Sequence, residues 1–505
     1  MKKLLAIGLS MLLALGTLCG CGGSTSSSSE PVDFGTKPDY SASTKQFEFF
    51  ANTAPTNGKW YVDGVEYDGG EDFRTTERYK EYKDAGLSIL QIAGRDEVNS
   101  SNVDHVLSLM DKAYAAGIDK IILKDARIYN MLYGTTTAEK EKKIQDMLEM
   151  DEAVLDAKIA EYMADYKDHP AFYGISILDE PSYMFAEAYG KQYKSIKRVM
   201  PECFVLYNLF PMLPVQSAAY GPEIERFEGT EEEYLFARYE QYVETFLDAM
   251  GCDHIQYDDY PMNVGEISPY FIPCLQICAK IAKERDIELC VMTQTFNMYV
   301  AGEQAKRKMS ENDAIFLNNI LLGFGVKRIS YFTYFTRPDN SSSGETFMDG
   351  QSFIKRNGEK TELYYYMQKI MAQNQTFAPY ILSFKFTANK FYTFTPTHFR
   401  STHAVHITDM GAFTALKNCI INKECAMVTE LYDAEKDNYM YMVMNLVDPL
   451  YKGSKAFQTT TLTFDAQYNY VMIYKNGEFT YHKLDENHSI NVKAAAGEAN
   501  FVLPY

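Results

Sequence analysis

Four segments in the first 340 residues share one hydrophobic pattern, in which a helical stretch ends near a glycine and a continuously apolar run follows. The segments are KDAGLSILQI from Lys83, AAGIDKIILKD from Ala115, DAMGCDHIQYDD from Asp248 and LLGFGVKRISYFTYF from Leu321. A glycine just past a helix adopts the left-handed conformation that ends it. A strand that is apolar throughout is covered on both faces. The pattern therefore predicts a parallel sheet with helical crossovers.

Strand-like apolar runs occur eight times in this region, and they begin near Phe47, Leu87, Lys120, Phe172, Cys203, His254, Ile287 and Arg328. Their spacing of roughly 30 to 50 residues is that of βα units with variable loops. Eight such units predict an α/β fold, a (β/α)8 TIM barrel over residues 46–378. A doubly wound open sheet is the alternative, and the lack of a glycine-rich phosphate loop after the first strand disfavours it.

The pattern changes near Leu382, where polar and apolar residues begin to alternate. Asn476 and Gly477 stand between two alternating runs, which is a strong indication of a β-hairpin. The sequence predicts a small C-terminal antiparallel β-sandwich over residues 379–505, with a structural role.

The N-terminus has the pattern of an export signal. Two lysines precede a short apolar run, which is too short for a stable membrane span. The following tetrad, Leu18-Cys19-Gly20-Cys21, resembles the lipobox of bacterial lipoproteins, with Cys21 as the lipidated residue. We expect a signal peptide at 1–21, a Gly/Ser-rich tether at 22–45 and anchoring to the outer face of a bacterial membrane. An ordinary secretory signal cut nearby is the alternative.

Composition narrows the function classes. The 505-residue chain is 46% hydrophobic, which suits a globular protein with a large core. Its net charge of −19 argues against nucleic acid or an acidic polymer as a partner, because like charges repel. No histidine and carboxylate set has zinc-binding spacing, and there is no Gly-x-Ser-x-Gly motif. The sequence implies no metal and no organic cofactor.

The stretch HPAFYGISILDEPS carries the strongest indication of chemistry, because a buried strand ends there on Asp179 and Glu180. Active sites of such barrels form at the C-terminal ends of the strands. We expect Glu180 to be the reacting group and Asp179 its partner. Since side chains alternate along a strand, either the strand bends near Pro181 or only one acid faces the site. The structural alternative is a helix cap formed by Ser182 or Asp179.

Other predicted strand ends are also polar or aromatic. Carboxylates and amides bind sugar hydroxyls, and aromatic faces pack on sugar C–H surfaces, so this mixture predicts a carbohydrate ligand. The residues expected to bind it are Asp125, Tyr207, Asn208, Tyr257, Asp259, Gln294, Tyr331 and Tyr334.

The segment HPAFYGISILDEP resembles the glycoside-hydrolase-like barrels of bacterial lipoproteins, and IQYDDYP, VMTQTF and ISYFTYF look like their later strands. The resemblance covers roughly Phe47 to Pro338. It implies a clan-A-like enzyme with Glu180 as the acid/base residue. It also implies a glutamate nucleophile at the seventh strand end, where this chain has Gln294.

That departure leaves three interpretations. A second carboxylate comes from elsewhere, with Asp258 and Asp259 as the candidates; or the substrate's acetamido group attacks while Asp179 orients it; or the barrel only binds carbohydrate. The first two describe a surface-anchored glycoside hydrolase, and the third a non-catalytic carbohydrate-binding lipoprotein. A bilobed solute-binding protein is disfavoured by the β-rich C-terminal part. As a general acid, Glu180 needs a raised pKa from burial or from the charge of Asp179.

Overall fold

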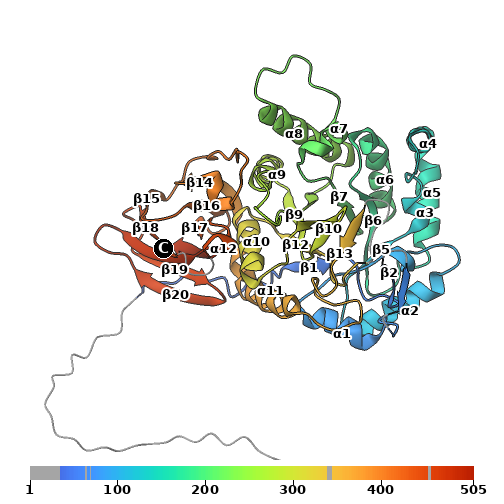
Figure 1. Ribbon diagram of the computed structural model, residues 1–505, viewed down its shortest axis with the longest axis horizontal. Coiled ribbons are helices and arrows are strands. Elements are labelled where there is room, and N and C mark those ends of the chain that lie inside the picture. The colour runs from blue at the N-terminus through green and yellow to red at the C-terminus, as the bar shows by residue number, and fades with distance from the viewer. Residues whose placement is uncertain (1–33, 63–64, 69, 338–343, 453–456) are drawn as a thin grey trace, which may run out of the picture.

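The computed structural model describes residues 34–62, 65–68, 70–337, 344–452 and 457–505. The predicted signal peptide at 1–21, with Cys21, lies outside the described residues, as does the tether up to residue 33. The fold is mixed α/β, with parallel sheets in the first part of the chain and antiparallel sheets at the C-terminal end (Figure 1).

Two four-stranded parallel sheets form the first part, and all eight predicted strand segments are confirmed as their strands. The first sheet has the order β4-β5-β6-β7 and the second β1-β12-β9-β8. The strands are β1 (Glu48–Ala51), β4 (Leu90–Ile92), β5 (Ile121–Lys124), β6 (Phe172–Asp179), β7 (Phe204–Asn208), β8 (His254–Asp259), β9 (Glu288–Gln294) and β12 (Arg328–Phe332).

The two sheets meet along both of their edges. A parallel bridge joins Phe50 of β1 to Ile89 just before β4, and another joins Leu209 just after β7 to Tyr257 of β8. At the second edge the Leu209 amide donates to the Gln256 carbonyl at 3.0 Å. Each bridge continues the parallel direction of the flanking strands, so the two sheets share one strand polarity.

One small apolar cluster draws side chains from both sheets. Its buried members are Phe50, Ile89, Ile122, Leu206 and Met292. They come from β1, β5, β7 and β9 and from the residue before β4. These strands therefore turn one face toward a common interior, and their other face packs under the helices.

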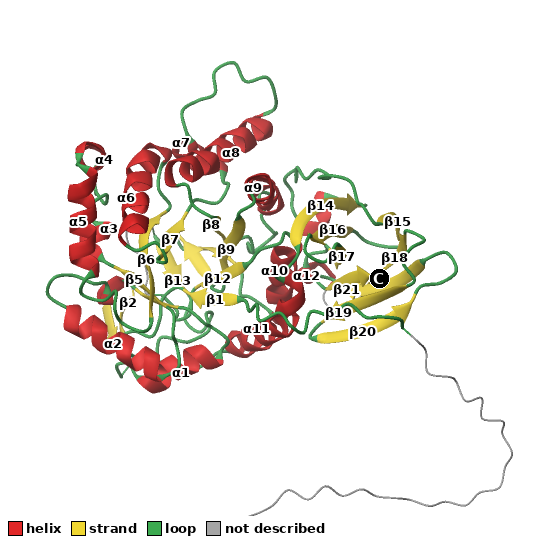
Figure 2. Ribbon diagram, turned by 180° about the vertical axis from the view of Figure 1, so that it is seen from behind, coloured by secondary structure: helices red, strands yellow, loops and turns green. Residues whose placement is uncertain are grey.

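Helices cover the outside of the parallel strands, as Figure 2 shows. Several begin at the expected caps: Thr136, Thr230 and Ser310 each form a capping box with the residue three positions on. The helices are α1 (Thr76–Asp84), α2 (Val103–Ala115), α3 (Ala126–Tyr129), α4 (Thr137–Glu149), α5 (Glu152–Met163), α6 (Ala186–Val199), α7 (Ser217–Tyr220), α8 (Glu231–Met250), α9 (Phe271–Arg285), α10 (Glu311–Gly323) and α11 (Glu362–Ile381).

An ionic network lies at the N-terminal ends of the parallel strands. The Arg328 Nε atom donates to Glu48 Oε2 at 2.8 Å, and Lys120 Nζ donates to Glu48 Oε1 at 2.5 Å. The Arg328 guanidinium also lies 4.3 Å from the centre of the Phe204 ring. The network therefore joins β1, β12 and β7 to the residue before β5, at the end opposite Asp179 and Glu180.

Two small sheets lie in loops of the first part. One is the hairpin β2 (Lys59–Val62) and β3 (Val65–Asp68), which follows β1. The other has the order β11-β10-β13 and follows β9 and β12; its strands are β10 (Met298–Val300), β11 (Glu303–Lys306) and β13 (Glu345–Phe347). Both lie in loops that leave the C-terminal ends of parallel strands.

The C-terminal part contains a six-stranded and a three-stranded antiparallel sheet, with a short helix, α12 (Pro449–Lys452). The predicted hairpin is confirmed: Asn476 and Gly477, at φ 50° and 92°, join β19 to β20. The first sheet has the order β14 (Lys385–Tyr392), β16 (Ala426–Asp433), β17 (Asn438–Asn445), β22 (Ala499–Pro504), β19 (Tyr470–Lys475), β20 (Glu478–Lys483), and the second β15 (Leu416–Ile421), β18 (Phe457–Phe464), β21 (Ser489–Ala495).

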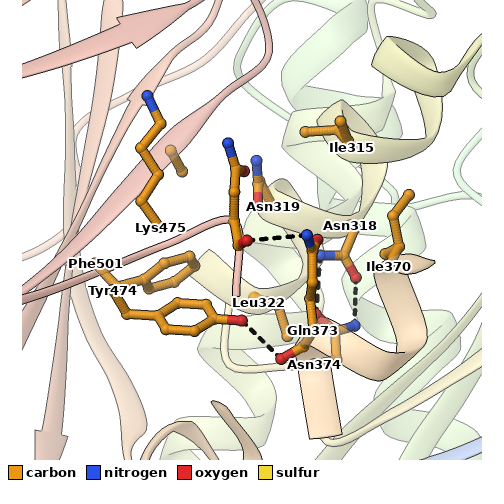
Figure 3. A pocket seen from close by; sticks show the side chains of 12 residues that line it. Ile315, Asn318, Asn319, Leu322, Ile370, Gln373, Asn374, Tyr474, Lys475 and Phe501 are labelled. Carbon is orange, nitrogen blue, oxygen red and sulfur yellow. Dashed lines mark hydrogen bonds between the residues drawn. The ribbon is translucent and has the colours of Figure 1, made fainter. Parts of the chain in front are cut away.

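These two sheets share a core and pack against α10 and α11. Val428 and Tyr441 of the larger sheet join Leu462 of the smaller one in a single buried cluster. Figure 3 shows the seam with the helices, where the Tyr474 hydroxyl donates to the Gln373 carbonyl at 2.6 Å. The cavity in this seam holds about 20 Å³, room for about one water, so it is a packing defect and not a ligand site.

Gly174 is required where β6 pairs with β7, because a Cβ at this position would overlap the carbonyl oxygen of Phe204. We expect Gly174→Ala to lower the free energy of unfolding by about 2–3 kcal/mol, as overpacking does. Gly265 is the matched control, since a Cβ there has no neighbour within 4 Å. Urea denaturation of both variants checks this, and equal stabilities would contradict the close pairing of β6 with β7.

Candidate active site

A β-bulge near the end of β6 sets the direction of Asp179. Ser176 pairs with Leu206 and Asp179 pairs with Asn208, so three steps along β6 match two along β7. Leu206 and Asn208, two residues apart on β7, point to the same face. The extra residue in β6 therefore puts Asp179 on the face of the sheet to which the interior residue Leu206 belongs.

The backbone then turns sharply at Glu180. Its φ of 45° lies in the left-handed region, which is unfavourable for a residue with a side chain. The Glu180 amide donates to the carbonyl of Asn208 at 2.8 Å, and this bond holds the turn against the end of β7. The strand thus bends as the sequence allowed, and both acids leave it on the side of Asn208 and β8.

Asp258 of β8 completes a group of three carboxyls, here called the acid cluster: Asp179, Glu180 and Asp258. The Asp258 side chain is buried, and its Oδ2 atom accepts a hydrogen bond from the Tyr260 hydroxyl at 2.8 Å. Its Oδ1 atom has no donor among the described residues. Asn208 lies between the acids and donates from Nδ2 to Asp179 Oδ1 at 3.1 Å.

The acid cluster retains protons at neutral pH. Loss of solvation raises the pKa of Glu180 to about 9, and the charges of Asp258, Asp179 and Glu345 raise it further, together with a hydrogen bond to Asp258. Burial likewise raises the pKa of Asp258 to about 7, and the charge of Asp179 adds to that effect. When it is protonated, Glu180 is a possible donor for the Asp258 carboxyl, whose Oδ1 atom has none among the described residues.

Solvent access differs within the acid cluster. Asp179 and Glu180 are exposed, whereas Asp258 is only 4% exposed. The carboxyls of glycosidase pairs stand about 5–5.5 Å apart in retaining enzymes and about 6.5–9.5 Å in inverting ones. The Asp258 carboxyl lies beside Glu180, and its charge raises the pKa of Glu180. Asp258 is therefore placed to hold the proton of Glu180, and Asp179 is the second carboxyl that a ligand can reach.

An aromatic side chain that the sequence did not single out, Tyr129, lies near Asp179 and contacts a second one, Tyr133. The charge of Asp179 contributes, after burial, to a raised pKa of about 12 for Tyr129, which places Tyr129 nearby. The Tyr133 ring lies 5.7 Å from that of Tyr129 and is 52% exposed. Lys124 Nζ lies 3.8 Å from the centre of the Tyr129 ring. Both tyrosines follow β5, a strand end for which the sequence indicated only charged groups.

Four predicted ligand-binding tyrosines lie elsewhere, buried between the strands and the helices. The Tyr207 hydroxyl contacts the His254 carbonyl and Cys252 Sγ. Tyr334 packs edge-on against Tyr82 of α1 at 4.8 Å. Tyr257 and Tyr331 are also buried outside the small interior cluster. Each occupies the outward face of its strand end, so the structure does not bring these side chains to the acid cluster.

Asp125 and Asp259 are also engaged elsewhere. Asp125 is 1% exposed; it caps α3, accepts from Arg127 and receives the Tyr166 hydroxyl at 3.0 Å. Burial raises the pKa of Asp259 to about 7. The positive charge of the nearby Lys306 ammonium opposes this rise. Asn208, by contrast, is the predicted binding residue that contacts the acid cluster.

Gln294 occupies the position at which the resemblance implies a nucleophile. Its Oε1 atom accepts from the Met262 amide at 3.0 Å, and its Nε2 atom donates to the Phe296 carbonyl at 3.1 Å. The side chain is 1% exposed. Gln294 thus fastens the loop after β8 to the end of β9, and it presents no group to a ligand.

Among the described residues, no group of three or more histidine, cysteine or acidic side chains is arranged to hold a metal ion. In the same part of the chain, none of the helices combines the length and apolarity needed to span a bilayer.

Comparisons with known proteins give distant likenesses. No family model and no curated protein matches the chain. Among solved structures it is similar to a family 5 glycoside hydrolase from Bacteroides vulgatus (12% identity, 90% of this chain and 94% of that one, TM-score 0.44). It is also similar to an α-L-arabinofuranosidase from Thermotoga maritima (10% identity, 92% of this chain and 97% of that one, TM-score 0.39). A β-galactosidase from Marinomonas ef1 is matched over 60% of this chain and 58% of that one (9% identity, TM-score 0.40). TM-scores this low carry no argument about the reaction.

The raised pKa of Glu180 predicts a specific pH dependence of stability. A glutamate has a pKa of about 4.3 when unfolded, and here it is raised to about 9. The folded state binds the extra proton between these values, so stability falls as pH rises through that interval. We expect Glu180→Gln to reduce this fall in urea denaturation between pH 5 and pH 9.

The control is Glu187→Gln in α6, which removes an exposed carboxylate outside the acid cluster. Its pH dependence should match that of the wild type. An unchanged slope in Glu180→Gln would show that Glu180 carries no extra proton in the folded state.

Proposed function

We propose that the chain is a glycoside hydrolase in which Glu180 is the general acid and Asp179 the second carboxyl. The observation that carries this is the acid cluster itself, in which Glu180, whose pKa is raised to about 9 by loss of solvation and by neighbouring carboxylates, stands beside Asp179 at the end of β6. A general acid must be protonated at the working pH and accessible to the leaving group. Glu180 meets both requirements.

We further propose that the two parallel sheets form one closed (β/α)8 barrel. The bridges at both edges and the shared interior cluster support closure. In that arrangement the C-terminal ends of β5, β6, β7 and β8 surround a single opening, where barrel enzymes bind their substrates. The barrel would occupy residues 46–378 and the β-sandwich residues 379–505.

The proposed reaction uses the cluster as follows. Glu180 donates its proton to the glycosidic oxygen while the bond from that oxygen to the anomeric carbon breaks. Asp179 stabilises the positive charge that develops on the sugar, either directly or through the substrate's own acetamido group. Water then adds to the anomeric carbon and returns a proton to Glu180. Asp258 and Tyr260 hold Glu180 in position and keep it protonated at the start.

Exposed apolar side chains at the same end suit a sugar ligand. Loops that follow the C-terminal ends of parallel strands carry several of the large exposed apolar residues, and Val215 is 85% exposed. Sugars present C–H faces that pack on such groups. The residues are Tyr133, Met184, Val215, Val264, Val300 and Met348.

We also propose that the protein is exported and held at a membrane surface through lipid on Cys21. The support is the sequence of the first 21 residues and the Gly/Ser-rich segment that follows them.

A non-catalytic carbohydrate-binding protein is the second candidate. The observation that favours it is Gln294, whose amide is committed to backbone groups where a glycosidase of the resembled type has its nucleophile. In that case Glu180 and Asp179 would bind sugar hydroxyls and no bond would break.

Glu180→Gln should lower the kcat for hydrolysis of an aryl glycoside about 10²- to 10⁴-fold, the usual contribution of a general acid. The loss should be larger with a phenyl than with a 2,4-dinitrophenyl leaving group, because the better leaving group needs less proton donation. The substrate is chosen by screening aryl glycosides, N-acetylhexosaminides among them, with the wild-type protein.

Glu187→Gln is again the control and should retain full activity. If Glu180→Gln hydrolyses both aryl glycosides as fast as the wild type, Glu180 is not the acid. If the wild type binds sugars but hydrolyses none of the panel, the binding function replaces the enzymatic one.

A further inference from the structure

A second candidate site lies at the ends of β1 and β4. A cavity of about 240 Å³ is lined there by the loop after β1, by the end of β4 with the short helix η1 (Gly94–Asp96), and by Arg337. Asn52 and Gln91 both line it, and Asn52 Nδ2 donates to Gln91 Oε1 at 3.3 Å. We call it the basic cavity, for the cations in its wall.

The basic cavity opens on the same side of the strands as the acid cluster. Phe50 and Ile89 belong to the interior apolar cluster. Asn52 and Gln91 stand two residues further along the same chain segments, and side chains two apart in extended chain share a face. The cavity therefore lies at the C-terminal ends of β1 and β4, with Asn52 and Gln91 on its inward side and with Tyr79 and Leu109 of the helical layer also in its wall.

Aromatic rings connect the two sites. The guanidinium of Arg337 lies 5.0 Å from the centre of the Phe332 ring, and that ring is 5.4 Å from the Tyr260 ring. The Tyr260 hydroxyl in turn donates to Asp258 at 2.8 Å. Two rings thus separate Arg337 from the acid cluster.

The charge of the cavity wall is opposite to that of the protein. The chain carries a net charge of −19, yet the cavity is lined by Lys59, Arg95 and Arg337 against one acid, Asp96. The Asp96 carboxylate is already neutralised by Arg74 at 2.6 Å. Lys59 pairs with Glu66 at 3.5 Å, and the positive charge that remains in the wall includes that of Arg337.

Arg337 is the cation best placed for a ligand. It lies over the rings of Phe332 and Phe347, at 5.0 and 5.7 Å, and none of the described acidic side chains forms an ion pair with it. Stacking on rings fixes the plane of a guanidinium and leaves its N–H edge available. Such an edge binds carboxylate and sulfate oxygens in pairs.

We propose that the basic cavity binds an anionic substituent of the saccharide, a carboxylate as in uronic acids or a sulfate ester, through Arg337. The saccharide part of this inference rests on the proposed function, and the charge preference rests on the cavity itself. The inference makes an anionic glycan the preferred ligand over a neutral one.

The test compares the binding of methyl β-D-glucuronide and methyl β-D-glucoside. The glucuronide carries a carboxylate at the position where the glucoside carries a hydroxymethyl group. Ligand-observed NMR titration of the protein should show the glucuronide binding about tenfold or more tightly, as a charged hydrogen-bond pair provides. D-Glucose 6-sulfate distinguishes a sulfate from a carboxylate preference. Arg337→Gln should abolish the preference, and Lys483→Gln, an exposed change of equal charge in β20, should retain it.

Equal affinity of the wild type for the glucuronide and the glucoside overturns the proposal, as does a preference that survives Arg337→Gln. If that variant does not fold, the salt dependence of binding to the wild type is the test. The ratio of the glucuronide affinity to the glucoside affinity must shrink between about 20 and about 300 mM NaCl, because salt screens electrostatic attraction. Binding is measured without turnover. An Arg337-dependent preference in a protein that hydrolyses no glycoside would therefore refute the proposed function alone, and hydrolysis of neutral glycosides without the preference would refute this inference alone.

Discussion

The structure depends on one electrostatic constraint: three carboxyl groups at the ends of β6 and β8 share a space in which they cannot all be charged. Burial of Asp258 and the repulsion between neighbouring carboxylates both favour retention of a proton. The hydrogen bonds from Asn208 and Tyr260 stabilise negative charge on Asp179 and Asp258. The pKa of Glu180, at about 9, is raised further than that of Asp258, at about 7, so our account places the remaining proton on Glu180. Protons in such a group are a property of the whole cluster.

Backbone geometry produces this arrangement and is not free of cost. A regular strand would send Asp179 and Glu180 to opposite faces, but the extra residue in β6 and the left-handed turn at Glu180 bring both to one side. A left-handed non-glycine residue persists only where surrounding contacts fix it. Here the bond from the Glu180 amide to Asn208 and the close pairing at Gly174 provide those contacts.

Local patterns were sufficient to predict the strands and part of the site. Apolar runs after helix-ending glycines identified all eight parallel strands, and Asn476-Gly477 identified the hairpin, because each depends on neighbouring residues alone. The pairing of Asp179 and Glu180 at a strand end, and the presence of Asn208 and Asp258 beside them, followed from the same logic. The direction of each side chain did not, because strands that are buried on both faces are apolar throughout and carry no alternation that separates the inward face from the outward one. Tyr207, Tyr257, Tyr331 and Tyr334 were assigned to the site for that reason, whereas they pack under helices. Tyr129 and Arg337 depend on loop conformation, which carried no distinct pattern in the sequence.

The central claim is that Glu180 carries a proton directed at Asp258 at neutral pH. Neutron diffraction from a perdeuterated crystal at pH 7 tests it most directly. Our account predicts nuclear density for a deuteron on the Glu180 carboxyl, pointing toward Asp258 Oδ1. Bare carboxylates at all three positions, bridged by water or by a cation, would contradict it.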